Sequence, residues 1–264
     1  MAPALQGVAF ITGAGGALGR AIAIEFARQG VKRIAGLDLR EDALIGTAEA
    51  LKAEASDVEF LPVTGDMSDE EQIKDVFAKV VAKFGRIDYA INNAAIGSPF
   101  IPTDETATAD FDRVQKINVK GTWLCEREEL RQMLKQDPLP QQPGSRRVPS
   151  RGSIVVVSSL LGIRAQPLNG LYTLSKHAVI GMVRTDSIDY ATKGIRINAV
   201  CPGFIDTPLV TPAIRELLKP QIDKTPMGRM AFPEEIADSV VYLASDRASY
   251  ITGTVLSVSE LSQS

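Results

Sequence analysis

The sequence predicts an α/β fold: one domain with a doubly wound, seven-stranded parallel sheet and helices on both faces. Two observations support this prediction. Short apolar runs rich in β-branched residues alternate with longer runs of helical spacing, an order typical of parallel strands joined by crossover helices. No linker or change of composition divides the 264 residues, so we expect a single domain covering residues 1–264.

Each predicted strand is a short apolar segment bounded by turn-forming residues. We expect strands at residues 8–12, 33–37, 58–63, 87–92, 153–158, 196–201 and 255–258. We expect helices at residues 18–29, 41–55, 68–84, 109–135 and 171–192, and a last one starting at Pro233. The stretch Ser68-Asp-Glu-Glu71 predicts a capped helix start, because a serine three residues before a glutamate can satisfy free N–H groups.

Two segments fall outside this alternation. Residues 136–151 (QDPLPQQPGSRRVPSR) are rich in Pro, Gln and Arg and predict a surface insertion in solvent. Residues 208–229 carry four prolines among apolar and hinge-like residues. That mixture favours a lid over a substrate pocket.

Composition and charge exclude several classes of function. The formal net charge of −3 leaves no basic footprint for nucleic acid and no polybasic membrane anchor. One histidine and two cysteines, Cys125 and Cys201, are too few for a metal site or a disulfide framework. No apolar run is long enough to span a bilayer, and the first residues lack the features of a secretory signal. We therefore expect a cytoplasmic protein that binds no metal.

A glycine-rich loop, Thr12-Gly-Ala-Gly-Gly-Ala-Leu-Gly19, joins the first strand to the first helix. Glycines let the backbone turn tightly and approach a pyrophosphate, which the N–H groups and dipole of the helix N-terminus would hold. Asp38 ends the second strand nineteen residues after Gly19. It could hold the ribose hydroxyls of an adenosine or be a solvated turn residue, and the spacing alone favours neither.

Tyr172 and Lys176 lie four residues apart on a predicted helix, so both side chains can reach one site. A lysine ammonium favours the phenolate of a neighbouring tyrosine and lowers the pKa of the phenol. Such a pair can exchange a proton near neutral pH. The alternative is an ordinary amphipathic helix, which this spacing alone does not exclude.

These features and several further motifs resemble the short-chain dehydrogenase/reductase family. The similarity extends from the first strand to about Gly253, and the motifs follow the order and spacing of the family. The further motifs are Asp66, Asn92-Asn-Ala-Ala95, Asn118, Ser158-Ser159 and Pro202-Gly-Phe-Ile-Asp-Thr207, with Ser159 thirteen residues before Tyr172. The resemblance implies a Rossmann fold and an NAD(P)-dependent oxidoreductase that acts on CH–OH or C=O groups.

The resemblance also implies catalytic roles for four residues. Tyr172 would be the general acid in carbonyl reduction or the base in alcohol oxidation, with its pKa lowered by Lys176. Ser159 would hydrogen-bond the substrate oxygen and stabilise developing charge. Asn118 would hold a water molecule that connects Lys176 to solvent for proton transfer.

The cofactor contacts implied by the resemblance follow the crevice from one end to the other. The pyrophosphate would lie on Gly13, Gly16, Leu18 and Gly19. The adenosine would contact Asp38, Asp66, Asn93 and Ala94. The nicotinamide and its ribose would contact Tyr172, Lys176, Pro202, Gly203, Ile205 and Thr207.

The chain departs from the family pattern at three places. Ala17 and Ala95 stand where glycines are usual, and we expect the methyl group of Ala17 to weaken cofactor affinity. Near the C-terminus, Val258-Ser-Glu-Leu261 replaces Val-Asp-Gly-Gly, in a region that often packs at subunit contacts. The expected assembly depends on that region.

The identity of Asp38 predicts NAD(H) rather than NADP(H). A carboxylate repels the 2′-phosphate of NADP and accepts hydrogen bonds from a free ribose diol. The glycine loop holds no cation to offset this charge. Arg40 is the nearby residue that argues against the prediction.

We expect an enzyme that interconverts a secondary alcohol and a ketone on a lipophilic small molecule, such as a terpenoid, polyketide or steroid. The lipophilic substrate is inferred from the lid, which carries little paired charge and offers Phe204, Leu209, Val210, Ile214 and Leu217. The insertion at 136–151 is similar to loops of fungal secondary-metabolite tailoring enzymes.

Two alternative functions stay open at this point. The same pocket could serve a cofactor-assisted cyclisation or another tailoring step, or the protein could be a non-catalytic dinucleotide-binding regulator. The complete set Ser159, Tyr172 and Lys176 argues against the regulator, since pure binding needs no proton relay. Family members commonly pair through the two long helices, so a homodimer or homotetramer is expected.

Overall fold

The computed structural model describes residues 5–140, 147–208 and 210–259, with the backbone alone at positions 213, 214 and 217. The strands in chain order are β1 (Val8–Thr12), β2 (Arg33–Asp38), β3 (Glu59–Thr64), β4 (Tyr89–Asn92), β5 (Gly152–Val157), β6 (Ile195–Pro202) and β7 (Val255–Val258). They form one seven-stranded parallel sheet in the order β3-β2-β1-β4-β5-β6-β7. Every predicted strand is present, and the predicted fold class is confirmed.

The central strands are almost continuously apolar because both faces of the sheet are covered. β1 and β5 are buried along their whole length. β1 pairs with β2 on one side and with β4 on the other, so the winding of the chain reverses there. A reversal of this kind leaves a crevice at the carboxyl ends of the strands, where doubly wound proteins bind ligands.

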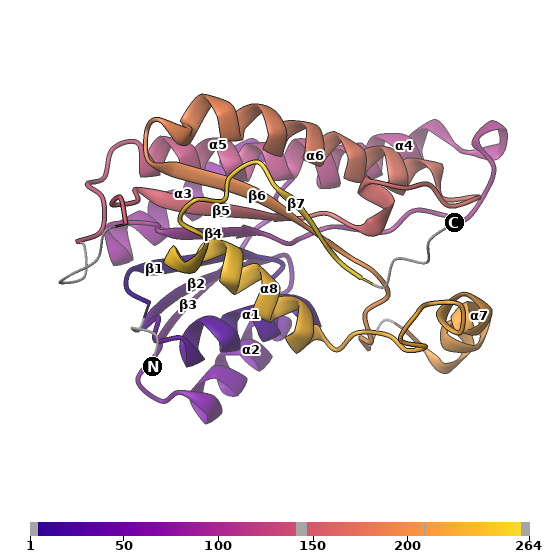
Figure 1. The fold of residues 1–264 in the computed structure, drawn as a ribbon, viewed down its shortest axis with the longest axis horizontal. Coiled ribbons are helices and arrows are strands. Elements are labelled where there is room, and N and C mark those ends of the chain that lie inside the picture. The colour runs from indigo at the N-terminus through magenta and orange to yellow at the C-terminus, as the bar shows by residue number, and fades with distance from the viewer. Residues whose placement is uncertain (1–4, 141–146, 209, 260–264) are drawn as a thin grey trace.

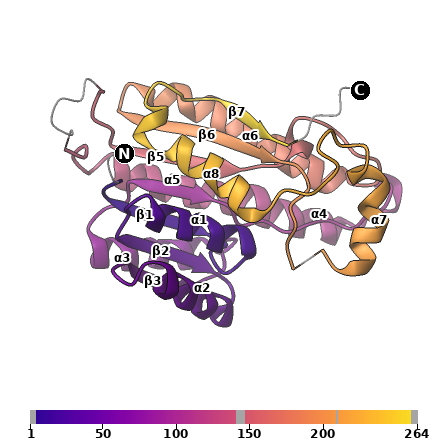
Figure 2. The ribbon, with the colours of Figure 1, turned by 60° about the horizontal axis from the view of Figure 1, so that its bottom comes forward.

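Two layers of helices cover the sheet (Figures 1 and 2). One layer contains α1 (Ala17–Arg28), α2 (Glu41–Glu54) and α8 (Pro233–Ala244). The other contains α3 (Glu70–Phe84), α4 (Thr108–Gln115), α5 (Thr122–Met133) and α6 (Gly170–Ala191). Phe10 of β1 packs on Phe77 of α3 with ring centroids 4.7 Å apart, and on the opposite face Tyr89 packs on Phe26 at 5.4 Å. In the described part of the chain, no helix has both the length and the hydropathy to cross a bilayer.

The N-cap of α3 is Asp69, one residue after the predicted Ser68. The Oδ1 atom of Asp69 accepts hydrogen bonds from the N–H groups of Glu71 and Gln72 at 3.0 and 3.2 Å. Ser68 is buried instead, and its N–H donates to Asp66 Oδ1 at 2.8 Å. Aspartate and serine are equally good N-caps, so the sequence could not decide between two neighbours.

The helix predicted at 109–135 is continuous but not uniformly α-helical. α4 passes into a π-helical stretch, Lys116–Gly121, before α5 begins. Turns of this kind are rare and often occur at functional sites. Asn118 lies within the stretch.

Residues 208–229 contain a helix that the sequence analysis missed. The helix α7 (Pro212–Ile222) lies apart from the two layers, beyond the carboxyl ends of the strands (Figure 1). The prolines of this segment argued against a helix in the sequence. Pro212 is the first helical residue, however, and at that position the N–H that proline lacks would have no partner within the helix. The chain returns to the sheet through a bridge between Ile205 and Ala231.

The insertion at 136–151 is joined to the sheet at both ends. Gln136 is buried, and its Nε2 donates to the carbonyls of Ile87 and Arg151 at 2.6 and 2.7 Å. The Arg151 guanidinium donates in turn to the carbonyl of Gln136 at 2.7 Å. The prediction of a solvent loop is therefore wrong for its first residue, and residues 141–146 lie outside the described part.

Candidate functional site

The glycine loop leaves the start of α1 open to an anion. Gly16 is the N-cap of α1, no side chain caps the helix, and its first turn carries no acidic residue. Free N–H groups and the positive end of the helix dipole therefore face the crevice. A Cβ built on Gly16 would meet only Gly13 O, at 3.4 Å, so the space before the loop is open. The loop fits the pyrophosphate of a dinucleotide.

Two other glycines are required by the shape of the loop itself. Gly13 has a φ of +66°, a left-handed conformation that favours glycine. A Cβ on Gly19 would lie 2.1 Å from Gly13 O. Leu18 contributes by packing on the core of the α1 layer. Ala17 is the first residue of α1, and its expected effect on cofactor affinity stays a prediction.

The carboxylate of Asp38 is hydrogen-bonded to the glycine loop. Its Oδ2 accepts a hydrogen bond from Gly15 N–H at 2.9 Å, and its Oδ1 accepts one from Arg40 N–H at 3.1 Å. The guanidinium of Arg40 pairs with the exposed carboxylate of Asp42 at 3.1 Å. Asp38 is therefore an ordered acceptor at the end of β2, and the Arg40 guanidinium has another partner.

Hydrogen bonds of Thr12 and Asn93 join the end of β1 to the end of β4. The N–H groups of Asn93 and Ala94 donate to Thr12 Oγ1, both at 3.0 Å. The Asn93 side chain donates to the carbonyls of Thr12 and Gly13 at 3.0 and 3.3 Å. Asn93 therefore braces the loop, and Thr12 is a site residue that the sequence analysis did not assign. Its position directly before Gly13, the first glycine of the loop, is the feature of the sequence that could have identified it.

Asp66 lies at the turn from β3 into α3. Its N–H donates to Gln72 Oε1 at 3.0 Å, and its Oδ1 accepts from Ser68 N–H. The turn therefore holds the Asp66 carboxylate at the carboxyl edge of the sheet. A contact with adenine stays a prediction.

The fold brings Ser159, Tyr172 and Lys176 together. Ser159 follows β5, and its Oγ accepts from Leu161 N–H at 3.1 Å while hydrogen-bonding with Tyr172. The ammonium of Lys176 lies 5.5 Å from the centroid of the Tyr172 ring and donates to Val157 O at 2.9 Å. Ser159 and the Tyr172–Lys176 pair, which belong to different elements of the chain, thus meet at one end of β5.

The pKa of Tyr172 is raised in this structure, contrary to the prediction. Burial of the phenol raises it, and the hydrogen bond with Ser159 lowers it only in part. Burial also lowers the pKa of Lys176 to about 8, because a buried ammonium loses its hydration. The Lys176 ammonium donates to the Val157 carbonyl and faces the ring of Tyr172, and burial is the main influence on the pKa of the phenol.

Asn118 connects the π-helical stretch to α6. Its Oδ1 accepts from Ile96 N–H at 2.8 Å, and its Nδ2 donates to Ile96 O at 2.9 Å and Ser175 Oγ at 3.1 Å. Ser175 Oγ donates to the carbonyl of Tyr172 at 2.8 Å. Asn118 therefore positions the turn of α6 that carries Tyr172 and Lys176, and the predicted water stays untested.

Cys201 forms part of the floor of this site. It is a fully buried residue of β6, and burial raises the pKa of its thiol. Hydrogen bonds with the Ser159 backbone and the Ser158 hydroxyl lower that pKa in part, as does the charge of Lys176. The thiol is thus a neutral packing group beneath the catalytic residues.

After β6, backbone hydrogen bonds join the residues before and after the segment 208–229 to each other and to β7. Gly203 N–H donates to Val258 O at 3.3 Å, and Ala231 N–H donates to Phe204 O at 2.9 Å. Among the predicted nicotinamide contacts, Pro202 ends β6, Ile205 forms the bridge to Ala231, and Thr207 O accepts from Val210 N–H at 2.9 Å. These residues lie at the carboxyl edge of the sheet, and their contacts with a nicotinamide stay a prediction.

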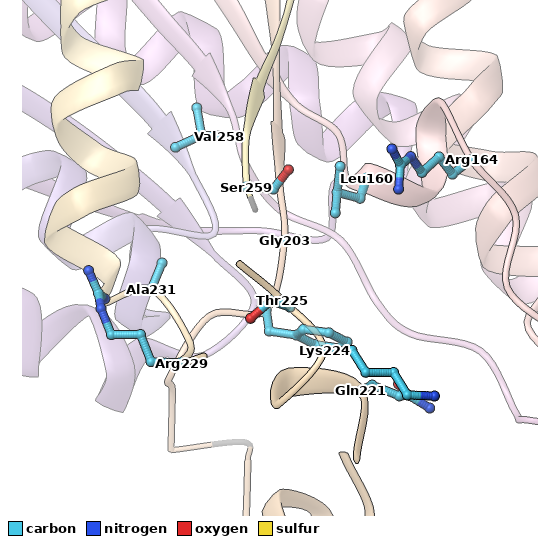
Figure 3. Close-up of a pocket in the computed structure, with 11 residues that line it drawn as sticks. Leu160, Arg164, Gly203, Gln221, Lys224, Thr225, Arg229, Ala231, Val258 and Ser259 are labelled. Atoms are coloured by element: carbon cyan, nitrogen blue, oxygen red, sulfur yellow. The ribbon is translucent and has the colours of Figure 1, made fainter. Parts of the chain in front are cut away.

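A cleft of about 270 Å³ lies between this edge and residues 208–229 (Figure 3). Leu160, Gly203 and Val258 line it from the sheet side, and Gln221, Lys224 and Thr225 line it from the segment after β6. Leu160 directly follows Ser159 in the chain, whereas Ser159, Tyr172 and Lys176 are not among the residues that line the cleft. Of the predicted apolar lid residues, Phe204 lines the cleft. Leu209 and the side chains at 214 and 217 lie outside the described part.

The chain matches a family profile described as Enoyl-(Acyl carrier protein) reductase over residues 13–260. It is 40% identical over 256 residues to the short-chain dehydrogenase srdC of Neurospora crassa, covering 94% of each protein. The likeness to a fungal short-chain dehydrogenase agrees with the resemblance seen in the sequence.

Solved structures give the same result. A crystal structure of levodione reductase matches with a TM-score of 0.87 and 35% identity, covering 96% of this chain and 95% of that one. A crystal structure of NAD+-bound xylitol dehydrogenase matches with a TM-score of 0.86 and 29% identity, covering 97% and 98%. The chain therefore belongs to the short-chain dehydrogenase/reductase family of oxidoreductases that bind nicotinamide dinucleotides.

Proposed function

We propose that this enzyme interconverts a secondary alcohol and a ketone with NAD(H), using Tyr172 as general acid and base. The observation that carries the proposal is the meeting of Ser159, Tyr172 and Lys176 at the carboxyl end of β5. The names of the solved relatives, a reductase of levodione and a dehydrogenase of xylitol, support chemistry between alcohols and carbonyls.

The catalytic side chains have complementary tasks. The bound nicotinamide supplies or accepts the hydride. In reduction, the Tyr172 hydroxyl would give its proton to the carbonyl oxygen as that oxygen gains an electron pair, while Ser159 Oγ–H donates a hydrogen bond to the same oxygen. In oxidation, the Tyr172 phenolate would take the proton of the alcohol.

Lys176 would restore the proton on Tyr172. With a pKa of about 8, its ammonium can release and regain a proton near physiological pH. Asn118 holds the helical turn between the two residues through Ser175. We propose that a water molecule beside Asn118 completes the path to solvent.

The proposed preference for NAD(H) depends on Asp38. Its carboxylate is held against Gly15 and stands where the adenosine ribose is expected. The guanidinium of Arg40 pairs with Asp42, which weakens the argument for NADP. Faster turnover with NADPH than with NADH at equal concentration would overturn this assignment.

The proposed substrate is a lipophilic small molecule, such as a terpenoid, polyketide or steroid. Leu160, Phe204 and Val258 give the cleft an apolar wall. The test is NADH and NADPH oxidation against a panel of carbonyl compounds of these classes, and NAD+ and NADP+ reduction with the matching alcohols. A role in fungal secondary metabolism and a cytoplasmic location stay predictions.

The panel also distinguishes the two alternative functions. A regulator would bind NADH and turn over no member of the panel, whereas a cyclase would convert a substrate without net change in NADH. The complete catalytic trio favours the oxidoreductase.

We further propose a homodimer or homotetramer built through α5 and α6. Both helices carry exposed apolar side chains on the outside of the molecule: Trp123 is 44% exposed and Ile188 77% exposed. Light scattering on the purified protein tests this, and a Trp123→Glu, Ile188→Glu double variant should be a monomer. An unchanged mass for that variant would show that other surfaces form the assembly.

A further inference from the structure

Glu126 is a buried carboxyl group to which no donor of the described chain is hydrogen-bonded. It belongs to α5, the residue is 1% exposed, and neither carboxylate oxygen accepts from an N–H or O–H group of the residues that the structure describes. Buried carboxylates are normally paired with a cation or with several donors, because taking a charge out of water is costly. The burial of Glu126 therefore needs another explanation.

The side chain that reaches Glu126 is a second acid, from the neighbouring helix. α5 and α6 lie side by side in one layer (Figures 1 and 2), and Asp186 of α6 is in hydrogen-bond contact with Glu126. We call these two residues the carboxyl pair. Two ionised carboxylates have only acceptor atoms and cannot form such a bond, whereas a protonated carboxyl and a carboxylate can.

The titratable groups that act on the carboxyl pair are further acids. Glu129 acts on Glu126 from the same helix, and its Oε2 accepts from Asn92 of β4. Asp189 acts on Asp186 from the same helix. Burial and the like charges raise the pKa of Glu126 well above its usual value, and burial and Asp189 raise that of Asp186 while the bond with Glu126 lowers it. Glu126 is therefore the member that keeps a proton.

The arginines of the two helices do not replace the missing donor. Arg127 and Arg131 of α5 pair with carboxylates of α3 and α5, namely Glu70 and Glu128. Arg184 of α6 is exposed. None of these arginines is among the groups that act on the carboxyl pair. A proton is thus the partner that the surroundings leave to it.

We propose that Glu126 and Asp186 share one proton, and that this proton joins α5 to α6. While the proton is present, the Glu126 carboxyl donates to the Asp186 carboxylate. Its loss leaves two like charges in contact, one of them buried, and weakens the junction between the helices. Since α6 also carries Tyr172 and Lys176, the helix that holds the proposed acid and base has a proton-sensitive contact. This contact is independent of the proposed alcohol–ketone chemistry.

The sign of the pH dependence follows from the raised pKa values. The folded protein keeps a proton that the unfolded chain releases above its ordinary carboxyl pKa values. The contribution of the carboxyl pair to stability is therefore complete in acid and is lost as pH rises through the folded-state pKa. The junction of α5 with α6 should loosen in the same direction.

Infrared spectroscopy measures the proton on Glu126 directly. A protonated carboxyl has a C=O band that a carboxylate lacks, and the part of the band that disappears in Glu126→Gln belongs to Glu126. We expect this band at about pH 6 in the wild-type protein. Asp186→Asn should lower the midpoint of its loss by about one pH unit or more, because asparagine removes the like charge and donates to the Glu126 carboxylate.

Asp189→Asn is the matched control for this shift. It removes a carboxylate from the same helix, but Asp189 is not among the groups that act on Glu126, so the midpoint should stay nearly unchanged. A missing Glu126 band at about pH 6, a midpoint that Asp186→Asn leaves in place, or an equal shift in Asp189→Asn would overturn the shared proton.

Hydrogen exchange of the α6 amides around Asp186 tests the junction itself. After correction for the intrinsic exchange rate, protection in the wild-type protein and in Asp189→Asn should fall as pH rises. It should stay level in Asp186→Asn and in Glu126→Gln, because an amide donates at every pH. Wild type and Asp186→Asn suffice if Glu126→Gln does not fold, since Asp186 is only partly buried. An equal fall in these two proteins would refute the proton-dependent contact.

Discussion

The cofactor side and the substrate side of the crevice are built in different ways. Around the glycine loop, side chains hydrogen-bond to the backbone. Thr12 Oγ1 accepts hydrogen bonds from the N–H groups of Asn93 and Ala94, and Asp38 Oδ2 accepts one from Gly15 N–H. Residues 208–229, the proposed lid, instead carry ion pairs between exposed side chains, such as Lys219 with Asp223. Exposed pairs contribute only about 0–1 kcal/mol each. The cofactor side is therefore preformed, and the substrate side is the part that can vary without disturbing the sheet.

The largest effect is expected where the two sides meet. Tyr172→Phe should lower kcat by about 10²- to 10⁴-fold, the usual contribution of a general acid or base, and leave the Kd for NADH unchanged. Steady-state kinetics and NADH fluorescence measure the two quantities. Tyr190→Phe, on the same helix α6, is the control. Full activity of Tyr172→Phe would remove Tyr172 from the chemistry.

A second prediction concerns the dependence of stability on pH, through one buried carboxyl group of α5. Glu129 of α5 is fully buried, its Oε2 accepts from Asn92 Nδ2 at 2.8 Å, and burial raises its pKa from 4.5 to about 8. Between these values the folded protein keeps a proton that the unfolded chain releases. Stability should therefore fall as pH rises from about 4.5 to 8, by at most about 1.4 kcal/mol per unit, and then level off.

Glu129→Gln tests this dependence, because glutamine has the shape of the protonated acid. Urea unfolding from pH 5 to 8 should show the variant gaining stability relative to wild type as pH rises. Glu49→Gln, an exposed change on α2, should run parallel to wild type. Parallel curves for Glu129→Gln would show that Glu129 does not hold a proton in the folded state.

The third prediction tests whether the cofactor side is preformed. Gly19→Ala should raise the Kd for NADH about tenfold or more and lower the unfolding free energy by about 1–3 kcal/mol, since its Cβ would strike Gly13 O. Gly181→Ala on α6 is the matched control, because nothing lies within 4 Å of the added Cβ. An unchanged Kd for Gly19→Ala would mean that the loop adapts.

The smallest effect is expected from Asp38→Asn. It should lower the ratio of kcat/KM for NADH over NADPH by about tenfold, which corresponds to 1.4 kcal/mol, as the repulsion of the 2′-phosphate is lost. Asp57→Asn, an exposed aspartate paired with Lys32, is the control. A ratio that stays constant would place the determinant of cofactor choice elsewhere.

Most of the cofactor side could be predicted from the sequence because its signals are local. The strand patterns and the glycine loop each lie within about ten residues, and Asp38 follows at a fixed spacing. The structure confirms the fold and brings Ser159, Tyr172 and Lys176 together.

The features that the sequence could not predict depend on distant parts of the chain. Gln136 is buried because Ile87 and Arg151 offer carbonyls to it. The pKa of Tyr172 is set by burial, which no spacing reveals. Residues 208–229 were expected to be apolar, but the cleft is also lined by Arg164, Lys224 and Arg229, and Arg164 lies sixty residues before Lys224 in the chain.

The bond from Gly15 to Asp38 ties cofactor choice to the shape of the loop. The carboxylate that would select the ribose diol also secures the turn on which the pyrophosphate would rest. If Asp38 selects NAD as proposed, an evolutionary change to NADP would give up an anchor of that turn, and a second substitution would have to replace it. The proposed preference would then be entrenched: single substitutions would relax it, and only compensated pairs would reverse it.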